Sequence, residues 1–167
     1  MTEKFKIKPI HEDAIAEALE KAERYRLLND PTQAESICRD ILRLRPDHQG
    51  ALVTIILSLT DQFSSERGAA GARTARDYAA RLDDEYRRLY YGGVICERQA
   101  RALLSRGMAR AFAYDGLRDA MDLYDQAERI RPAGNDDAIL RWNSCVRTIR
   151  QEKLSPRTEE DEPQLLE

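Results

Sequence analysis

The sequence predicts an all-α protein of about seven helices arranged as antiparallel pairs. Apolar and small residues recur at three- and four-residue spacings through most of the chain, which is the period of one helical face. The six prolines and eight glycines stand mostly at the boundaries of these runs. A composition of 42% hydrophobic and 34% charged residues suits helices with one buried and one solvated side. At 167 residues the chain is long enough to bury a continuous core.

Residues 16–46 are expected to form the first helix pair, and the rest of the chain is organised around it. Small Ala22 and Ala34 allow the two helices to approach closely. The turn falls at Asn29-Asp30-Pro31, because proline suits the first turn of a helix, where its missing N–H costs nothing. Pro46 ends the second helix. The buried face of the first helix is predicted to comprise Ala18, Ala22, Tyr25 and Leu28.

The spacing of Ala22, Tyr25, Ala34, Ile41 and Pro46 resembles that of the tetratricopeptide repeat (TPR). A second unit, residues 101–134, resembles the same family through Ala120, Tyr124, Ala127 and Pro132. With the opening unit at residues 15–48, the resemblance covers two clear units separated by a degenerate middle. It implies a right-handed array of antiparallel helix pairs, in which the first helix of each pair lines a concave groove.

The middle of the chain departs from the 34-residue period. The second helix is predicted over residues 32–44 and the third over 49–62, with LVTIILSL at the centre of the core. A loop is expected over 63–71, followed by a helix over 72–91. Gly92-Gly93 then indicates a kink or a junction between helices.

The second half contains a stripe of small residues and then a turn. Gly93, Cys96, Ala100, Leu103 and Gly107 follow one another at helical spacing, and this pattern favours close approach to a neighbouring helix. In the second unit, Met108 instead of Gly107 occupies a position that the family gives to a small residue. An extra residue in a turn at Tyr114-Asp115-Gly116 would explain why the repeat register is shifted by one residue here.

A final helix over 136–152 is expected to cap the array. Asn135 is its expected N-cap, and Ile139, Trp142, Val146 and Ile149 form its apolar face. The predicted domain therefore spans residues 11–152. It follows an irregular arm over 1–10 and precedes a proline- and acid-rich tail over 153–167, which is expected to be disordered.

The sequence favours a cytoplasmic location. Its first residues have no apolar stretch of signal-peptide length, and no run approaches the length of a membrane span. Cys38, Cys96 and Cys145 are unclustered and fall within helical patterns. They are predicted to be small buried hydrophobic residues in a reducing compartment.

Charge is unevenly distributed along a chain of net charge −3. Residues 67–110 contain ten arginines and five acids, and residues 151–167 contain six acids and two bases, which gives +5 and −4. The two regions could attract one another or bind different partners. Alternatively, the arginines line solvated helix faces.

No catalytic, cofactor or metal site is expected. The sequence has no glycine-rich phosphate loop, no metal-spaced Cys/His cluster and no nucleophile elbow. Adjacent acids such as Asp83-Asp84 would diverge by about 100° on a helix, so solvated charge is the better interpretation.

The resemblance places a binding groove on the first helix of each pair. Leu19 and Glu23 stand where family members that clamp a peptide carboxylate carry Lys and Asn, so that specialisation is not expected. An arginine-lined groove with an aromatic residue would suit an acidic, partly apolar peptide. The alternative is that its arginines pair with Asp or Glu on neighbouring turns. The groove positions are Ala16, Leu19, Glu23, Arg26 and Leu27 in the first unit, and Arg98, Arg101, Ser105, Ala109 and Phe112 further on.

The expected function is a non-enzymatic adaptor or scaffold that binds another protein or peptide without a cofactor. One alternative is self-assembly, in which LVTIILSL or the aromatic residues of the central helix pack against a second copy. Helical spacing instead predicts that most of Tyr86, Tyr90, Tyr91 and Trp142 belong to the core. The other alternative is nucleic-acid binding through residues 67–110. Low lysine content and the lack of a recognised motif argue against it.

Overall fold

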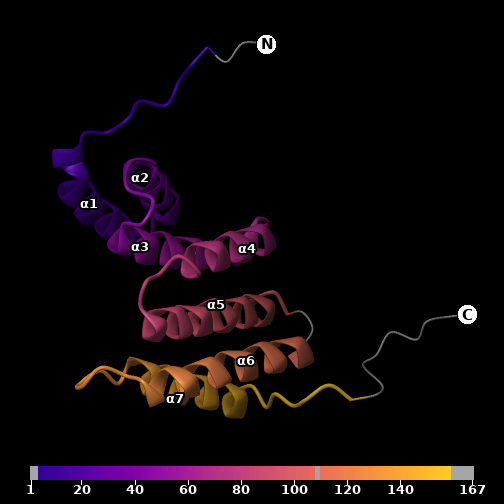
Figure 1. Cartoon of the computed structure of the whole chain (residues 1–167). Helices are drawn as coiled ribbons and strands as arrows, with labels where there is room; N and C mark the ends of the chain where they lie inside the picture. The colour runs from indigo at the N-terminus through magenta and orange to yellow at the C-terminus, as the bar shows by residue number, and fades with distance from the viewer. Residues whose placement is uncertain (1–3, 108–109, 159–167) are drawn as a thin grey trace, which may run out of the picture.

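The computed structural model describes residues 4–107 and 110–158, and over these ranges the protein is all-α (Figure 1). A short 3₁₀ turn, η1 (Glu12–Ala14), precedes the first α-helix, and residues 5–10 before it are irregular. Seven α-helices are described, which confirms the prediction of an all-α protein with about seven helices. They are α1 (Ile15–Leu27), α2 (Pro31–Leu44), α3 (Gln49–Thr60), α4 (Gly68–Ala79), α5 (Glu85–Ser105), α6 (Arg110–Arg129) and α7 (Asp137–Gln151).

Each helix packs against the next one in the chain, and the odd-numbered helices also meet, α1 with α3 and α3 with α5. Figure 1 shows α1–α4 grouped at one end and α5–α7 at the other. Each group has its own cluster of buried residues. Ile95 and Ala102 of α5 belong to the first cluster, so α5 joins the two groups. None of the described helices has the length and apolar character to cross a membrane.

The first hairpin forms as its sequence predicts. Asp30 caps α2 by accepting a hydrogen bond from the Gln33 N–H at 3.2 Å, and Pro31 is the first helical residue. Ala22 and Ala34 are both fully buried. The placement of Leu28 on the buried face is wrong, because α1 ends at Leu27 and Leu28 is 70% exposed. Tyr25 also reaches solvent, with 38% of its surface exposed.

Helix α3 is the centre of the first core, as predicted. Its N-cap is His48, whose Nδ1 accepts from the Ala51 N–H at 3.1 Å. Leu52, Ile55 and Ile56 are fully buried. Even its hydroxyl groups lie inside, and Ser58 donates to the Thr54 carbonyl at 2.7 Å, which satisfies a buried polar group within the helix.

The single helix predicted over 72–91 is wrong. Helix α4 begins earlier, at Gly68, and ends at Ala79, and α5 begins at Glu85. Asp84 caps α5 by accepting from the Arg87 N–H at 3.3 Å, while Leu82 anchors the connection in the core. The predicted loop over 63–71 is correspondingly shorter. The first residue of α4 has to be glycine, because a Cβ on Gly68 would lie 2.1 Å from the Phe63 carbonyl oxygen.

Of the kink or junction predicted at Gly92-Gly93, the junction between helices is wrong, because both residues lie inside α5. A Cβ on Gly93 would lie 2.5 Å from Cε1 of Tyr124, a separation that real Cβ atoms do not show. The glycine therefore permits the close packing of α5 on α6.

The predicted turn at Tyr114-Asp115-Gly116 does not exist, since α6 runs through it. A Cβ on Gly116 would lie 3.0 Å from that of Ala100, so this glycine is again a site of close helix approach. The chain reverses instead after Ser105, with Gly107 at a φ of 66°. Gly107 is thus a turn residue and not part of the small-residue stripe. Residues 101–134 do not form one helix pair, although Ala120, Tyr124 and Ala127 are fully buried on α6. Met108 and Ala109 lie outside the described residues.

Helix α7 closes the second core, close to its predicted bounds. Ala138 and Cys145 are buried, and Trp142, Val146 and Ile149 pack against them. Asn135 accepts from the Asp137 N–H at 2.9 Å. Of the predicted tail, residues 153–158 are described, and Leu154 is buried in the second core. Arg157 pairs with Asp115 at 2.7 Å, and residues 159–167 lie outside the description.

The three cysteines are free thiols, and the prediction that they are buried holds for two of them. Cys38 and Cys145 are buried, and Cys96 is half-buried. Burial raises the pKa of the Cys38 and Cys145 thiols to about 12. Both therefore stay protonated at neutral pH and are poor nucleophiles.

Candidate functional site

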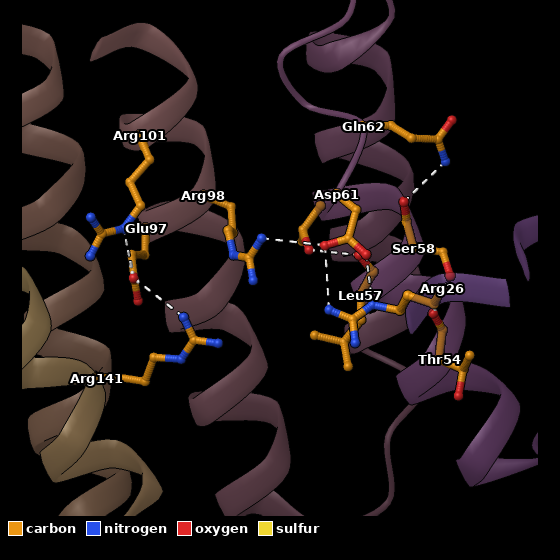
Figure 2. Close-up of polar contacts among 11 residues, drawn as sticks. Arg26, Thr54, Leu57, Ser58, Asp61, Gln62, Glu97, Arg98, Arg101 and Arg141 are labelled. Carbon is orange, nitrogen blue, oxygen red and sulfur yellow. Dashed lines mark hydrogen bonds and ion pairs between the residues drawn. The ribbon is translucent and has the colours of Figure 1, made fainter. Parts of the chain in front are cut away.

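Asp61 connects three odd-numbered helices through two arginines (Figure 2). It is the C-cap residue directly after the last residue of α3. Its Oδ2 lies 2.7 Å from Nε of Arg26 on α1, and its Oδ1 lies 3.3 Å from Nη1 of Arg98 on α5. All three side chains are at most 30% exposed, so solvent screens these pairs only in part. The single carboxylate thus fixes α1 and α5 relative to α3.

Glu97 on α5 is the centre of a second cluster of charges. It is only 1% exposed, although it carries an acidic side chain. It accepts hydrogen bonds from the Tyr124 hydroxyl at 2.6 Å, from Nε of Arg101 at 2.8 Å and from Nη1 of Arg141 at 3.4 Å. A buried carboxylate is tolerated only with such partners, because removing an unpaired charge from water is costly.

Arg101 extends this cluster to α7. Its Nη1 donates to Oγ1 of Thr148 at 2.8 Å and its Nη2 donates to Oγ of Ser144 at 3.0 Å. All three of its nitrogens are therefore engaged. Together with Asp61 and its two arginines, the cluster forms a charged row, which we define as Arg26, Asp61, Glu97, Arg98, Arg101 and Arg141. The row crosses α1, the end of α3, α5 and α7.

The buried carboxylate changes the titration of its neighbours. Burial and the Glu97 charge raise the pKa of the Tyr124 hydroxyl, so Tyr124 remains a hydrogen-bond donor. Burial by itself lowers the pKa of Arg141. The Glu97 charge and the Tyr90 hydroxyl raise this pKa by more than burial lowers it, so the net shift is upward. Arg141 therefore stays positively charged although it lies 29% exposed beside the core.

A pocket of about 500 Å³ opens on the charged row between α3, α5 and α7. Its walls combine charged side chains with hydroxyl groups and few apolar ones. This composition suits a polar or charged ligand rather than an apolar one. The lining residues are Thr60, Asp61, Phe63, Ser64, Glu97, Arg98, Arg101, Ala102, Ser105, Arg141 and Ser144.

A larger hollow of about 1520 Å³ lies between α2 and α4 and includes Lys6 and Ile7 of the arm. It also carries several arginines, among them Arg39, Arg43 and Arg81. However, none of its charged residues is buried, whereas Glu97 holds the arginines of the smaller pocket from inside the core. We therefore place the candidate site at the smaller pocket, because its side chains are fixed before a ligand arrives.

The predicted groove residues are only partly brought together. Arg98, Arg101 and Ser105 line the pocket, and Arg26 joins it through Asp61. Leu19 packs towards α3 near Gly50, and Glu23 is exposed on α1, so neither is a pocket residue. Phe112 lies on α6, half-exposed, with the Arg157 guanidinium 4.7 Å from its ring centre. The two alternatives for the arginines coexist, since Arg98 and Arg101 both line the pocket and pair with acids.

Sequence reasoning missed Asp61, Glu97, Arg141 and Ser144 as members of this site. One signal was available for Asp61, because a carboxylate at the C-terminal end of a helix opposes the helix dipole and calls for a cation. The Glu97–Arg101 pair has the i,i+4 spacing of a helical ion pair. The contact of Arg141 with Glu97 spans 44 residues and has no local signal.

No family model, curated protein or solved structure matches this chain. Among the described residues, no group of three or more His, Cys, Asp or Glu side chains is placed to hold a metal ion.

Proposed function

We propose that the protein is a non-enzymatic adaptor of TPR type that binds a segment of another protein along the charged row. The observation that carries this proposal is that side chains from α1, α3, α5 and α7 meet on one surface, which opens into a pocket. In TPR proteins the first helices of successive pairs line the groove, and we propose the same role for α1, α3, α5 and α7.

The ion pairs between helices support a face that is formed before the partner arrives. Arg98 pairs with a residue 37 positions away and Arg101 bonds to residues 43 and 47 positions away. A long charged side chain loses about 2 kcal/mol of rotamer entropy when it is fixed. Because folding already restrains these arginines, less of that cost remains for binding.

We propose a cytoplasmic location for the same protein.

Self-assembly through LVTIILSL receives no support from the fold. Leu52, Ile55 and Ile56 are fully buried by the chain's own helices, and Tyr86 is buried in the second core. The exposed apolar side chains lie elsewhere, among them Leu27 at 82% exposure at the end of α1. Self-association would therefore have to use another surface.

A tagged full-length chain should be used to recover bound proteins from the native host at low and high salt, with identification by mass spectrometry. We expect a stoichiometric partner protein that remains bound at low salt and is weakened at high salt, because charged side chains dominate the face. Recovery of the bait alone, at a mass above one chain, would replace the adaptor proposal with self-assembly.

A further inference from the structure

The acceptor groups of the charged row are already occupied by its own donors. Glu97 accepts hydrogen bonds from a tyrosine hydroxyl and two guanidiniums, and Asp61 is paired with two further guanidiniums. The row as a whole contains four guanidiniums and two carboxylates, which leaves a surplus of two positive charges. The pocket at this row is therefore suited to an anion and not to a cation.

Two arginines of the pocket keep hydrogen-bond donors for such an anion. A guanidinium has five N–H groups on three nitrogens. Within the described residues, the hydrogen bonds of Arg98 engage Nη1 alone. Arg141 uses Nη1 for Glu97 and also interacts with the Tyr90 hydroxyl, so further N–H groups remain on it. Figure 2 shows both guanidiniums between the carboxylates of Glu97 and Asp61, and both line the pocket.

The hydroxyl groups of the pocket divide into donors and acceptors. Ser144 accepts a hydrogen bond from Nη2 of Arg101 at 3.0 Å, which leaves its own O–H as a donor. Ser105 donates to the Ala102 carbonyl at 2.9 Å, so its oxygen keeps its capacity to accept. The Ser64 hydroxyl has neither a donor nor an acceptor as partner within the described part of the chain, and the residue is exposed. The wall can therefore bind both an anionic group and neutral hydroxyl groups.

The free donors fit a phosphoryl group better than a carboxylate. They reach the pocket from α5 through Arg98 and from α7 through Arg141 and Ser144, and so from more than one side. A carboxylate has two oxygens in one plane and a single negative charge. A phosphate monoester has three acceptor oxygens that point in different directions and a charge of about −1.5 to −2 at pH 7. Its charge balances the surplus of the row, and its oxygens can meet donors on both helices.

The pocket also has room for more than a phosphoryl group. Its volume of about 500 Å³ falls within the range of small-molecule sites, about 300–1,000 Å³. Among the described residues of its wall, Phe63 is the one aromatic side chain, and it is 4% exposed. A nucleobase would therefore find no ring to stack on. The exposed hydroxyls of Ser64 and Ser105 suit a ligand whose remaining part carries hydroxyl groups.

We propose that this pocket binds a phosphorylated sugar. The phosphoryl group accepts hydrogen bonds from Arg98, Arg141 and Ser144, and the sugar hydroxyls bond to Ser64 and Ser105. Buried Glu97 fixes the Arg141 guanidinium before the ligand arrives, which lowers the ordering cost of binding. This inference goes beyond the proposed adaptor function and requires no partner protein.

The test is isothermal titration calorimetry of the full-length chain with ribose 5-phosphate at constant ionic strength. Inorganic phosphate is the probe for the phosphoryl group alone, and acetate is the probe for a carboxylate. Arg98→Gln removes a guanidinium, and Ser105→Glu places a carboxylate at an exposed pocket position without breaking an ion pair of the row. Arg129→Gln is the charge-matched control, because Arg129 forms an exposed pair with Asp125 on α6, outside the pocket.

We expect saturable binding of ribose 5-phosphate, weaker binding of inorganic phosphate and no saturable binding of acetate. Arg98→Gln should weaken the binding of ribose 5-phosphate about tenfold, through the loss of charge-assisted hydrogen bonds. Ser105→Glu should weaken it at least as much through charge repulsion, with unchanged circular dichroism. Arg129→Gln should leave the affinity unchanged.

Three results would overturn the inference: no saturable binding of ribose 5-phosphate, acetate binding of equal affinity, or an equal loss of affinity with Arg129→Gln. Inorganic phosphate that binds as tightly as ribose 5-phosphate would also contradict it, because the sugar hydroxyls would then contribute nothing. These titrations contain no partner protein, so their failure would leave the adaptor proposal to be decided by partner recovery.

Discussion

At the residue scale, Glu97 is a buried carboxylate that depends on its hydrogen-bond and ion-pair partners. It is an acid at 1% exposure, between two cores, with a tyrosine and two arginines as partners. Removing one partner of such a group costs more than the interaction contributes, because the group remains buried with an unmet hydrogen bond. The Tyr124 hydroxyl is the partner whose removal alters the site least in shape, since a phenylalanine ring fills the same space.

Tyr124→Phe should therefore lower the free energy of unfolding by about 1–3 kcal/mol, the cost of leaving a buried acceptor unsatisfied. Urea denaturation followed by circular dichroism measures the change. Tyr25→Phe is the matched control, because Tyr25 is 38% exposed, and we expect a change within about 0.5 kcal/mol there. Equal effects of the two substitutions would show that the hydrogen bond to Glu97 contributes nothing.

At the element scale, the packing of α5 on α6 depends on which of two adjacent glycines faces the partner helix. Gly93 faces the ring of Tyr124, where a Cβ would lie 2.5 Å from Cε1. Gly92 has room for a side chain, because a Cβ there would lie 3.5 Å from Cδ1 of Leu123, an ordinary van der Waals contact. The Tyr124 ring is fully buried and bonded to Glu97, so it cannot move aside without cost.

The two alanine substitutions should therefore change stability in opposite directions. Gly92→Ala should stabilise the protein by up to about 1 kcal/mol, because alanine is the better residue in a helix interior. Gly93→Ala should destabilise it by about 1–3 kcal/mol through overpacking. Thermal and urea unfolding of both variants measure the difference. A stabilising Gly93→Ala would mean that α5 and α6 are less closely packed than described.

Individual elements show which parts of the fold the sequence could and could not predict. Asp30-Pro31 and the apolar run of α3 carry their structure locally, and both were predicted with nearly correct bounds. The break at residues 80–84 was missed because the apolar spacing of Tyr78, Leu82 and Tyr86 continues across it. The sequence predicts a kink or junction at Gly92-Gly93 and a turn at Gly116, whereas Gly93 makes room for the Tyr124 ring and Gly116 lies close to Ala100. Local sequence does not reveal the partner that a glycine packs against.

The same distinction applies to the candidate site. Arg98, Arg101 and Ser105 are predicted to belong to a binding groove because the resemblance to the TPR family implies groove positions there, and they do line one pocket. Asp61, Arg141 and Ser144 reach that pocket from other helices. Their roles follow from tertiary packing over 37 to 44 residues of chain. Only Asp61 has a local signal, a carboxylate placed against the dipole of α3.

At the scale of the whole molecule, two buried clusters are joined through α5 and through the charged row. Ile95 and Ala102 provide the apolar part of this connection, and the Arg26–Asp61–Arg98 group provides the polar part. The polar part is also the part that carries the proposed function. Loss of Asp61 should therefore affect both stability and the placement of Arg98.

Asp61→Asn should lower the free energy of unfolding by about 1–3 kcal/mol, since two partly buried guanidiniums lose their counter-charge. Glu17→Gln is the matched control, because its pair with Lys21 is exposed and such i,i+4 pairs contribute about 0.3–0.5 kcal/mol. Urea denaturation at low and high salt measures both. Equal effects would show that Asp61 does not connect the helices energetically.

The central claim is that a partner binds the charged row, and the most direct measurement is recovery of that partner by variants of the tagged chain. Arg98→Glu should abolish recovery while circular dichroism shows unchanged helicity. Arg129→Glu makes the same charge change on exposed α6 and should recover the partner as the natural chain does. Undiminished recovery by Arg98→Glu would contradict the account and place the binding surface elsewhere on the molecule.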